Sequence, residues 1–419
     1  MTSATPDLAD SGPRGDRVHS IEVIPIALPV RREWKWRGLA GSLGRSVILR
    51  VRTQDGREGF GEAVPQPDWG GDFNRYSGET PTTVAHTVTD LLGPEVTGLS
   101  PFDVELILQR MDAVLKGHTY AKAAIEMAMY DLQGKIVRQP VYNLIGGRAH
   151  DNVRIAHMIG LMNPDEAEEE IRGALSEGTR AFQIKGTGEL AHDVDLVKHM
   201  RQVAGPGVAL RFDANQGYRG SGAKCAIAAV RALAEAGIDM VEQPTEGWAQ
   251  MSAVCAAVDI TVIADESSWQ PQDVVGIAAL AAADAISIYL AKAGGIARAK
   301  RVAAVAEAHG MPCDVNGSLE SAVGNAANIH FAFSTPAVNL PCVIPVSGPA
   351  DSEARVSGRY FVDDVVSRSM SWVNGGVIPS DEPGLGITVE EDKLSEYRIN
   401  RSSETLRSCD TPEGAPSHD

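Results

Sequence analysis

The most constraining feature of this sequence is a series of polar residues, each of which ends a short apolar strand pattern. In residues 208–213, apolar side chains alternate with others at the period of two that is typical of a β-strand, and the Asn-Gln-Gly of residues 215–217 predicts a turn. The arrangement recurs at intervals of 23 to 29 residues, about one strand and one helix, and its terminal residues are Lys185, Asp213, Glu242, Asp265 and Tyr289. In a parallel barrel the carboxyl ends of the strands share one face, and active sites are built there.

Three of these terminal residues are carboxylates. Any one of them could be a helix N-cap at a strand-to-helix turn. Three on consecutive strands instead favour a shared site for a hard divalent cation, and Mg²⁺ is the ion that we expect at Asp213, Glu242 and Asp265. Asn215 and Glu266 lie next to these residues in the sequence and could orient the ligands by hydrogen bonds.

The pattern around these strand ends predicts the fold class. From about residue 152, predicted strands alternate with helical segments that are rich in alanine. Eight strands are predicted, at residues 153–160, 181–185, 208–213, 237–242, 260–265, 284–289, 311–316 and 341–346. This alternation favours an α/β fold with a (β/α)8 barrel over residues 151–350, and no Gly-x-Gly-x-x-Gly fingerprint follows a strand to favour an open dinucleotide-binding sheet.

The segments that flank the barrel predict a second domain. Three strand patterns, at residues 21–28, 46–52 and 58–64, precede a helical pattern that runs from residue 82 to about 135. Strands followed by helices describe an α+β domain, which we assign to residues 18–150. We expect residues 351–400 to return to it and complete a capping domain. Residues 1–17 and 401–419 are polar and are expected to be disordered tails.

Composition excludes several partners. The 419-residue chain carries a formal net charge of −17, which argues against nucleic acid and anionic membrane surfaces as partners. Five scattered cysteines without Cys-x-x-Cys spacing predict reduced thiols and a cytoplasmic protein. No apolar stretch is long enough for a membrane span, and the N-terminus lacks the apolar region of a signal peptide. We further expect a homo-oligomer.

Strand parity indicates which side chains face the barrel interior. In residues 181–185, Phe182 and Ile184 are apolar, so Gln183 and Lys185 are predicted to point inward. The same parity turns Tyr289 inward, whereas Lys292 lies past the strand end and is expected to point elsewhere. Gln183 and Lys292 are further candidates for orienting the ligands or binding the substrate. A charged residue at the tip of a barrel strand favours a functional role for Lys185 over that of a solvated lysine.

These motifs together resemble the enolase superfamily. The matching segments are Gln183-Ile184-Lys185, Asp213-Ala214-Asn215, Val241-Glu242-Gln243-Pro244, Ala264-Asp265-Glu266-Ser267 and Ala291-Lys292-Ala293-Gly294-Gly295. The pattern is similar to the muconate-lactonising-enzyme-like (mandelate racemase/muconate lactonising enzyme) subgroup over roughly residues 20–400. The resemblance implies a modified TIM barrel with a capping domain, Mg²⁺ on the three carboxylates, and a small carboxylate substrate. It also implies that lysine removes the α-proton of that substrate through a metal-stabilised enediolate.

Two departures from the subgroup pattern bear on the overall reaction. Gln183 stands where the subgroup usually has the first lysine of Lys-x-Lys, and Tyr289 stands where it usually has a second catalytic lysine, while Lys292 matches a different lysine. Racemisation of this type uses two lysines, whereas cycloisomerisation or syn elimination of water needs only Lys185. We therefore expect a cycloisomerase or a lyase (dehydratase), with Tyr289 as a hydrogen-bond or proton donor. The alternatives are an amino-acid or dipeptide racemase or epimerase and, from another class, a catalytically inactive metal-binding scaffold.

Three more residues are candidates through the resemblance. Glu320 resembles the glutamate that the family has after the seventh strand, and its alternative role is that of an acid at a helix N-terminus. Trp34 and Trp36 lie in the loop at 31–37, which in this family closes over the substrate. They are expected to form an apolar wall or an aromatic site for a cationic group; the alternative is ordinary surface packing.

Overall fold

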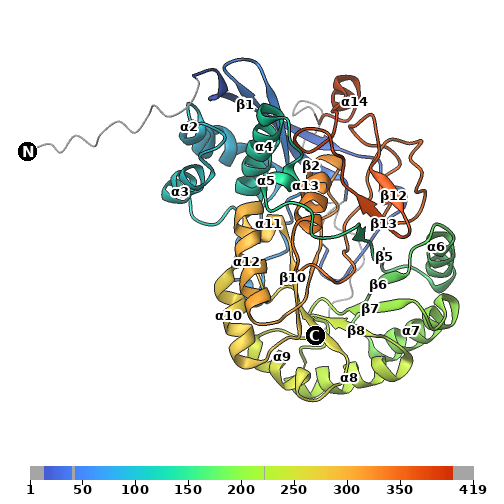
Figure 1. Ribbon diagram of the computed structural model, residues 1–419. Helices are drawn as coiled ribbons and strands as arrows, with labels where there is room; N and C mark the ends of the chain where they lie inside the picture. Colours follow the sequence, from blue (N-terminus) through green and yellow to red (C-terminus); the bar gives the residue numbers. More distant parts are fainter. Residues whose placement is uncertain (1–13, 40–42, 221, 400–419) are drawn as a thin grey trace, which may run out of the picture.

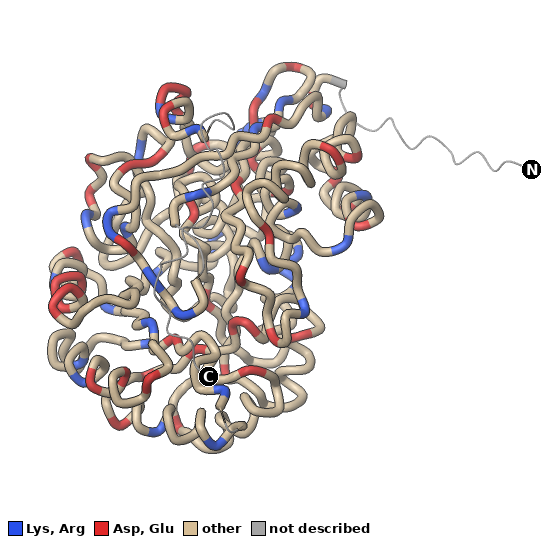
Figure 2. The backbone as a smooth tube through the Cα atoms, turned by 180° about the vertical axis from the view of Figure 1, so that it is seen from behind, with Lys and Arg blue, Asp and Glu red and all other residues tan. Residues whose placement is uncertain are grey.

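The computed structural model shows a curved parallel sheet surrounded by helices and, against one end of it, a smaller α+β domain (Figure 1). It describes residues 14–39, 43–220 and 222–399. No helix in this part of the chain is both long and apolar enough to cross a membrane. Figure 2 shows basic and acidic residues distributed over both domains.

The predicted tails fall mostly on residues 1–13 and 401–419, which lie outside the described residues. The chain joins the smaller domain before residue 18, the predicted end of the N-terminal tail. Arg57 forms an ion pair with Asp16 at 2.8 Å, and Arg17 donates a hydrogen bond to the carbonyl of Gly98 at 2.9 Å. The smaller domain therefore includes residues that composition alone assigned to a tail.

The smaller domain is built on an antiparallel sheet of the order β1-β2-β3. Its strands are β1 (Val18–Ala27), β2 (Arg45–Thr53) and β3 (Glu58–Ala63). Helix α4 (Thr119–Val137) packs closely on β3. The backbones are so near that a Cβ atom at Gly61 would overlap the carbonyl oxygen of Ala124, and only glycine fits there. This close approach of helix and strand produces one core that the sheet and α4 share.

Short helices complete this domain. They are η1 (Arg14–Asp16), η2 (Asp72–Asn74), α1 (Pro81–His86), the π-helical η3 (Thr87–Leu92), α2 (Gly93–Val96), α3 (Val104–Val114) and α5 (Val141–Leu144). Helix α1 begins with a capping box in which the side chains of Thr80 and Thr83 bond each other's backbone N–H groups. The predicted order of strands first and helices afterwards is therefore observed.

Seven parallel strands form the larger sheet, in the order β11-β10-β9-β8-β7-β6-β5. They are β5 (His157–Ile159), β6 (Ala181–Lys185), β7 (Ala209–Asp213), β8 (Met240–Glu242), β9 (Thr261–Ala264), β10 (Ala285–Ile288) and β11 (Cys313–Val315). Each strand lies beside its neighbour in the sequence, which is the order of a (β/α) barrel. The predicted fold class is confirmed.

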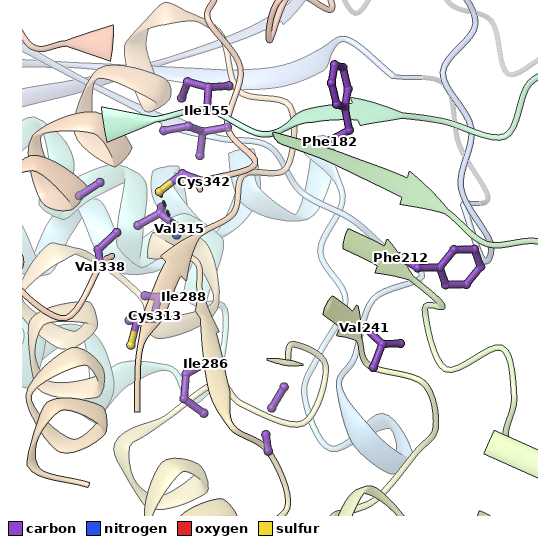
Figure 3. Packing of buried hydrophobic residues seen from close by; sticks show 14 of the residues in the cluster. Ile155, Phe182, Phe212, Val241, Ile286, Ile288, Cys313, Val315, Val338 and Cys342 are labelled. Atoms are coloured by element: carbon purple, nitrogen blue, oxygen red, sulfur yellow. Dashed lines mark hydrogen bonds between the residues drawn. The ribbon is translucent and has the colours of Figure 1, made fainter. Parts of the chain in front are cut away.

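The predicted eighth strand, at residues 341–346, is wrong as a regular strand. Only two of its residues make parallel bridges, Cys342 to Ile155 and Val343 to Asn316. Pro341 and Pro345 flank them and lack the N–H donors that a longer ladder would need. The two bridges still join the edges of the seven-stranded sheet, and Figure 3 shows Cys342 between Ile155 and Val315.

Helices surround this sheet on its outer side. They are α6 (Pro164–Ser176), α7 (Leu190–Ala204), α8 (Ala223–Ala236), α9 (Trp248–Cys255), α10 (Pro271–Leu280), α11 (Leu290–Ala293), α12 (Ile296–Ala308) and α13 (Ala322–Phe333). Phe182, Phe212 and Val241 from successive strands share a core with apolar residues of these helices (Figure 3). The alternate strand positions, such as Gln183 and Arg211, therefore face the barrel interior.

The C-terminal segment contacts both domains. It bridges the smaller domain at Ile26–Arg398 and Pro140–Gly384, and helix α14 (Glu391–Glu396) lies near β1 and β2 (Figure 1). Next to the barrel, it forms a small sheet of β12 (Ser371–Val373), β13 (Gly376–Ile378) and β4 (Val153–Arg154). The predicted first barrel strand is thus divided, and only its second half enters the large sheet.

Buried acids of the smaller domain cap helices of the barrel. Glu126 of α4 accepts a hydrogen bond from the backbone N–H of Ala297 at 2.9 Å, at the start of α12. Glu62 of β3 accepts one from the hydroxyl of Ser321 at 2.7 Å, at the start of α13. Carboxylates at helix N-termini are stabilised by the helix dipole. These contacts hold the smaller domain, from here on the cap, against the barrel, so that the loops of the cap lie over the strand ends.

Candidate active site

The strand register brings the first candidate residues side by side. Lys185 pairs with Asp213 across β6 and β7, and Asp213 pairs with Glu242 across β7 and β8. The ammonium of Lys185 donates to Asp213 Oδ2 at 2.5 Å. The amide of Gln183 donates to Glu242 Oε2 at 2.8 Å and reaches Asp213 Oδ2 at 3.4 Å. The predicted parity of β6 therefore turns both polar side chains toward the carboxylates.

Glu242 lies at the centre of a buried polar network. Asn316 Nδ2 donates to its Oε1 atom at 2.9 Å, and Arg211 Nη1 lies 3.2 Å from its Oε2 atom. Arg211 also forms an ion pair with Asp314. Sequence reasoning missed Asn316, although it ends the predicted strand at 311–316 as the other candidates end theirs. It also missed Arg211, which the parity of residues 208–213 turns inward.

Asp265 is held from the other side of the barrel. Lys292 Nζ donates to its Oδ1 atom at 2.6 Å and to its carbonyl at 2.9 Å, and the Tyr289 hydroxyl lies 3.4 Å from its Oδ2 atom. The expectation that Lys292 points elsewhere is wrong. The chain turns into helix α11 directly after Tyr289, and this turn brings position 292 back over the end of β10. The Lys292 ammonium lies 4.5 Å from the centre of the Tyr289 ring.

Asn215 and Glu266 lie beside these carboxylates. The backbone N–H of Asn215 donates to Asp213 Oδ1 at 2.9 Å, and its amide donates to Glu266 Oε1 at 3.2 Å. Oε2 of Glu266 and Oδ1 of Asn215 are buried without a hydrogen-bond partner among the described residues. The pair is therefore placed to orient a ligand at the site.

Burial of so many acids raises their proton affinity. Desolvation, together with the charge of Glu242, raises the pKa of Asp213 to about 6. Desolvation raises the pKa of Asp265 to about 7, although the Lys292 ammonium opposes this change. For Lys185, burial lowers the pKa, but the charges of Asp213 and Glu242 outweigh it and leave the pKa above its ordinary value. Burial is therefore the main reason why these carboxyl groups hold protons more tightly than exposed ones.

The donor set fits a hard divalent cation. Asp213, Glu242 and Asp265 offer carboxylate oxygens, and the amide oxygens of Gln183 and Asn316 are buried without a hydrogen-bond partner in the described chain. Oxygen-only donors suit Mg²⁺. In the structure the carboxylates form hydrogen bonds to lysine and amide side chains. Among the described residues, no three His, Cys, Asp or Glu side chains lie close enough together to coordinate one ion.

A cavity of about 460 Å³ opens above these residues, between the barrel and the cap. Lys185, Gln183, Asp265, Glu266 and Tyr289 form its floor together with Asn215. The cap contributes two loops, and the remaining wall is mixed, with the polar Gln216 and Arg219 beside Met158, Gly317, Leu319 and Val343. The cap residues are Trp36, Arg37, Gly38, Gln66, Asp68, Trp69, Gly70, Gly71 and Asn74. Two loops of the cap therefore determine what the cavity admits.

Sequence reasoning missed the second of these cap loops. Trp69 packs on Tyr289 with 4.8 Å between the ring centres, and it lies 5.5 Å from the Lys292 ammonium. Trp36 takes the corresponding place above Lys185, whose ammonium lies 5.8 Å from the Trp36 ring. An aromatic residue within Pro-Asp-Trp-Gly-Gly, directly after a cap strand, was the available signal for Trp69.

Two predicted site residues lie away from the cavity. Trp34 is 2% exposed and packs edge-on against Tyr360, with 4.9 Å between the ring centres, so its expected place at the barrel mouth is wrong. Glu320 is buried beneath the cavity and accepts a hydrogen bond from the backbone N–H of Ser318 at 3.0 Å. Leu319 has φ +63°, and this turn directs Leu319 to the cavity and Glu320 away from it.

Family models match both parts of the chain. Residues 40–146 match the mandelate racemase/muconate lactonizing enzyme N-terminal domain, and residues 166–393 match the enolase C-terminal domain-like family. The chain belongs to the mandelate racemase/muconate lactonizing enzyme family of the enolase superfamily. The resemblance that the motifs indicated is thereby confirmed.

Known members of the mandelate racemase/muconate lactonizing enzyme family resemble the chain over nearly its whole length. N-succinyl-L-Arg/Lys racemase of Bacillus cereus is 30% identical over 385 residues, covering 91% of this chain and 98% of the racemase. The structure of 2-chloromuconate cycloisomerase from Rhodococcus opacus has a TM-score of 0.82 and 27% identity, covering 92% of this chain and 100% of that one. A dipeptide epimerase from Enterococcus faecalis, solved with Mg and the dipeptide L-Leu-L-Tyr, has a TM-score of 0.77 and 27% identity, covering 89% and 99%.

The chain is therefore an enolase-superfamily enzyme, an isomerase or a lyase. The alternative of an inactive scaffold is not supported, because racemases, epimerases, cycloisomerases and a dehydratase are all among its relatives.

Substitutions of the two tryptophans in the first cap loop are expected to have different effects, one on the stability of the protein and the other on substrate binding. Trp34→Ala should lower the free energy of unfolding by about 3–5 kcal/mol, because it removes a large buried ring. Trp36→Ala should leave stability nearly unchanged and raise KM more than it lowers kcat, because Trp36 lines the cavity above Lys185. Urea denaturation and steady-state kinetics of both variants check this, and equal stability losses with unchanged kinetics would contradict it.

Proposed function

We propose that this enzyme uses Mg²⁺ and Lys185 to remove the α-proton of a small carboxylate substrate, and that its overall reaction is a cycloisomerisation or a dehydration. The observation that carries the proposal is the placement of Lys185 and Tyr289 around the carboxylate cluster. Lys185 ends β6 and Tyr289 follows β10, so the two lie two strands to either side of Glu242 on β8. Both line the same cavity.

Asp213, Glu242 and Asp265 are the residues that would hold the ion. When bound, Mg²⁺ supplies positive charge that stabilises the negative charge developing on a substrate carboxylate. Gln183 and Asn316 hold Glu242 in place through their amide groups, at 2.8 and 2.9 Å. Arg211 compensates part of the charge of Glu242 from below and helps to fix the orientation of this carboxylate.

Lys185 is the proposed base. Its hydrogen bond to Asp213 and the nearby charge of Glu242 hold the pKa of the ammonium above its ordinary value. A cation on the carboxylates would offset the negative charge that stabilises the ammonium, and burial would then favour the neutral amine, which can accept a proton. The reprotonated ammonium at the same position stabilises the enolate charge.

Tyr289 is the proposed donor on the other side. Burial and the charge of Asp265 raise the pKa of its phenol well above the usual value. The phenol therefore keeps its proton at neutral pH and donates hydrogen bonds but does not abstract protons. A site with one lysine base and one phenol favours reactions on a single face of the substrate over racemisation.

A racemase or epimerase of an amino acid or dipeptide is the second candidate. Lys292 favours it, because its ammonium lies 4.5 Å from the centre of the Tyr289 ring, and because racemases and epimerases are among the relatives. This candidate ranks second because Lys292 is bonded to Asp265 and to the carbonyl of Ser287 and does not line the cavity.

Exchange of the α-proton with solvent tests the proposal. A library of small carboxylates is incubated with the enzyme in D₂O, with Mg²⁺ and, as a control, with EDTA. We expect Mg²⁺-dependent incorporation of deuterium at Cα for at least one chemical class, followed by ring closure or loss of water. Metal-independent exchange, or none with the Mg²⁺-loaded enzyme, would refute it.

The cellular location, the partners and the oligomeric state of the protein are proposals. A cytoplasmic location is supported by Cys225, Cys255, Cys313 and Cys342, which are free thiols. The absence of nucleic-acid and membrane partners and the homo-oligomer stay predictions.

A further inference from the structure

A buried acid of the cap anchors the second cap loop, residues 66–76, to the barrel. Asp72 is 2% exposed. One oxygen of its carboxylate accepts a hydrogen bond from Gln216 Nε2 at 2.9 Å, in the loop after β7, and the other accepts one from the Ser267 hydroxyl at 2.6 Å, in the loop after β9. The backbone N–H of Asp72 donates to the carbonyl of Glu266 at 3.3 Å. One residue thus fastens this loop to the ends of two barrel strands.

The hydrogen bonds continue from Ser267 to a proposed metal ligand. Gln243, which directly follows Glu242, donates from its Nε2 atom to the Ser267 hydroxyl oxygen at 2.7 Å. Its Oε1 atom accepts a hydrogen bond from the backbone N–H of Asp265 at 2.9 Å and from that of Ser267 at 3.2 Å. An unbroken series of hydrogen bonds therefore joins Asp72 to Asp265.

The backbone at this junction is held in an unfavourable conformation. Phe73, Gln216 and Gln243 have φ of +57°, +58° and +37°. Residues of these types disfavour the left-handed region, and such a conformation persists only where surrounding contacts enforce it. Phe73 directly follows Asp72, and Gln216 donates to the Asp72 carboxylate. The contacts of Asp72 therefore help to fix a geometry that the chain by itself does not favour.

The anchored loop carries an aromatic wall of the cavity. Trp69 lies in it and packs on Tyr289, with 4.8 Å between the ring centres. Other residues of the loop line the cavity beside this ring. The loop lies so close to the barrel that a Cβ atom at Gly71 would be 3.1 Å from the carbonyl oxygen of Glu266. Closure of the cavity therefore depends on contacts that also reach the carboxylate cluster.

We infer that Asp72 is a positioning residue that couples the second cap loop to the metal site, so that binding of a divalent cation and closure of the cavity favour each other. The inference rests on the proposed function for the role of Asp265 as a metal ligand. The bond from the Asp265 backbone to Gln243 orients this ligand. Coupling between two sites is reciprocal, so a loop that strengthens cation binding is itself held more firmly by the cation, and by the same factor.

Two equilibrium measurements on the full-length protein test this inference. Hydrogen exchange at the amides of residues 72 and 73 reports docking of the loop, because both amides donate to oxygen atoms of the barrel. Calorimetry gives the Kd of Mg²⁺. In the wild type, Mg²⁺ should slow the exchange of these amides. Asp72→Ala should speed their exchange, remove the effect of Mg²⁺ on it, and weaken Mg²⁺ binding about 3- to 30-fold.

Two further variants define the path of the coupling. Asp72→Asn keeps an oxygen that can accept from Gln216, so it should show only part of the loss. Ser267→Ala removes the hydroxyl between Asp72 and Gln243 and should also weaken Mg²⁺ binding. The double variant of Asp72→Ala with Ser267→Ala should lose no more than the larger single loss, because both changes break one series of bonds. Ser267→Ala also keeps the test decisive if Asp72→Ala does not fold.

Tyr76→Phe is the matched control. The Tyr76 hydroxyl donates to Asp273 at 2.8 Å, which is another hydrogen bond between this loop and the barrel. Asp273 accepts its other bonds from the backbone N–H groups of Trp269 and Gln270, at the start of α10. Tyr76→Phe should therefore leave the Kd of Mg²⁺ and the effect of Mg²⁺ on exchange unchanged. Thermal unfolding of each variant confirms that the fold is intact.

The inference and the proposed function fail in different ways. Wild-type affinity for Mg²⁺ in both Asp72→Ala and Ser267→Ala, or an equal loss in Tyr76→Phe, would overturn the coupling, and α-proton exchange by the wild type would still support the reaction. If Mg²⁺ slows exchange of the loop through Asp72 but no carboxylate exchanges its α-proton, the proposed reaction is wrong and the coupling stands.

Discussion

Replacing Lys185 with methionine is expected to abolish α-proton exchange and leave the metal site in place. Lys185 is buried, lines the cavity and lies 2.5 Å from Asp213, so it is a base that both contacts the carboxylate cluster and faces the cavity. Loss of a positioned base costs roughly 10²- to 10⁴-fold in rate. The cost is larger if the ammonium also stabilises the enolate. The rate of deuterium incorporation at Cα, followed by NMR, measures the effect.

Two measurements keep the Lys185→Met result interpretable. Mn²⁺ or Mg²⁺ titration should show that the variant still binds the ion, because Asp213, Glu242 and Asp265 are unchanged. Lys292→Met is the informative comparison, because this lysine orients Asp265 and does not line the cavity. It should weaken metal binding more than Lys185→Met does. Exchange at near wild-type rate in Lys185→Met would remove Lys185 from the mechanism.

Arg211→Met is expected to destabilise the protein by about 3–5 kcal/mol, because it leaves buried carboxylates without their cation. Arg211 is 1% exposed, donates to the carbonyl of Pro341 at 2.8 Å and forms ion pairs with Asp314 and Glu242, both fully buried. Urea denaturation without added metal measures the loss. A change below about 1 kcal/mol would mean that the carboxylates take up protons or other partners at little cost.

The double variant Arg211→Met with Asp314→Leu gives the matching control. It removes the main buried pair together, so the uncompensated charge of Asp314 is gone. Replacing a buried ion pair by apolar side chains is often neutral, whereas removing one member is costly. The double variant should therefore recover most of the stability that the single variant loses. Glu242 keeps its bonds to Gln183 and Asn316, and this explains why recovery without a third change is expected.

Much of the barrel was predictable from the sequence because each strand is marked by the alternation of its own neighbouring residues. An apolar period of two marks each strand, and parity then places Gln183 and Lys185 toward the interior, where Gln183 contacts Glu242 and Lys185 contacts Asp213. The fold class follows from the regular alternation of strands and helices. These inferences needed only which residues alternate and where each pattern ends.

The errors arose where the chain leaves a regular element. Lys292 follows the end of β10, and only the tight turn of α11 brings it back to Asp265. Glu320 follows a residue with positive φ, which no periodic pattern indicates. Trp34 and Trp36 share one irregular loop, and tertiary contacts with Tyr360 decide that Trp34 is buried. Arg37 and Trp69 reach the cavity from loops whose paths depend on the docking of the cap.

The stereochemical course of exchange tests most directly the claim that Lys185 is the single base and Tyr289 a donor. A substrate identified by the exchange screen is incubated as one enantiomer in D₂O, and NMR in a chiral solvating agent follows both the label and the configuration. We predict that deuterium enters from one face, with retention of configuration, and that the opposite enantiomer does not accumulate. Formation of both enantiomers at comparable rates would contradict this account and would assign the opposite face to Lys292 or another group.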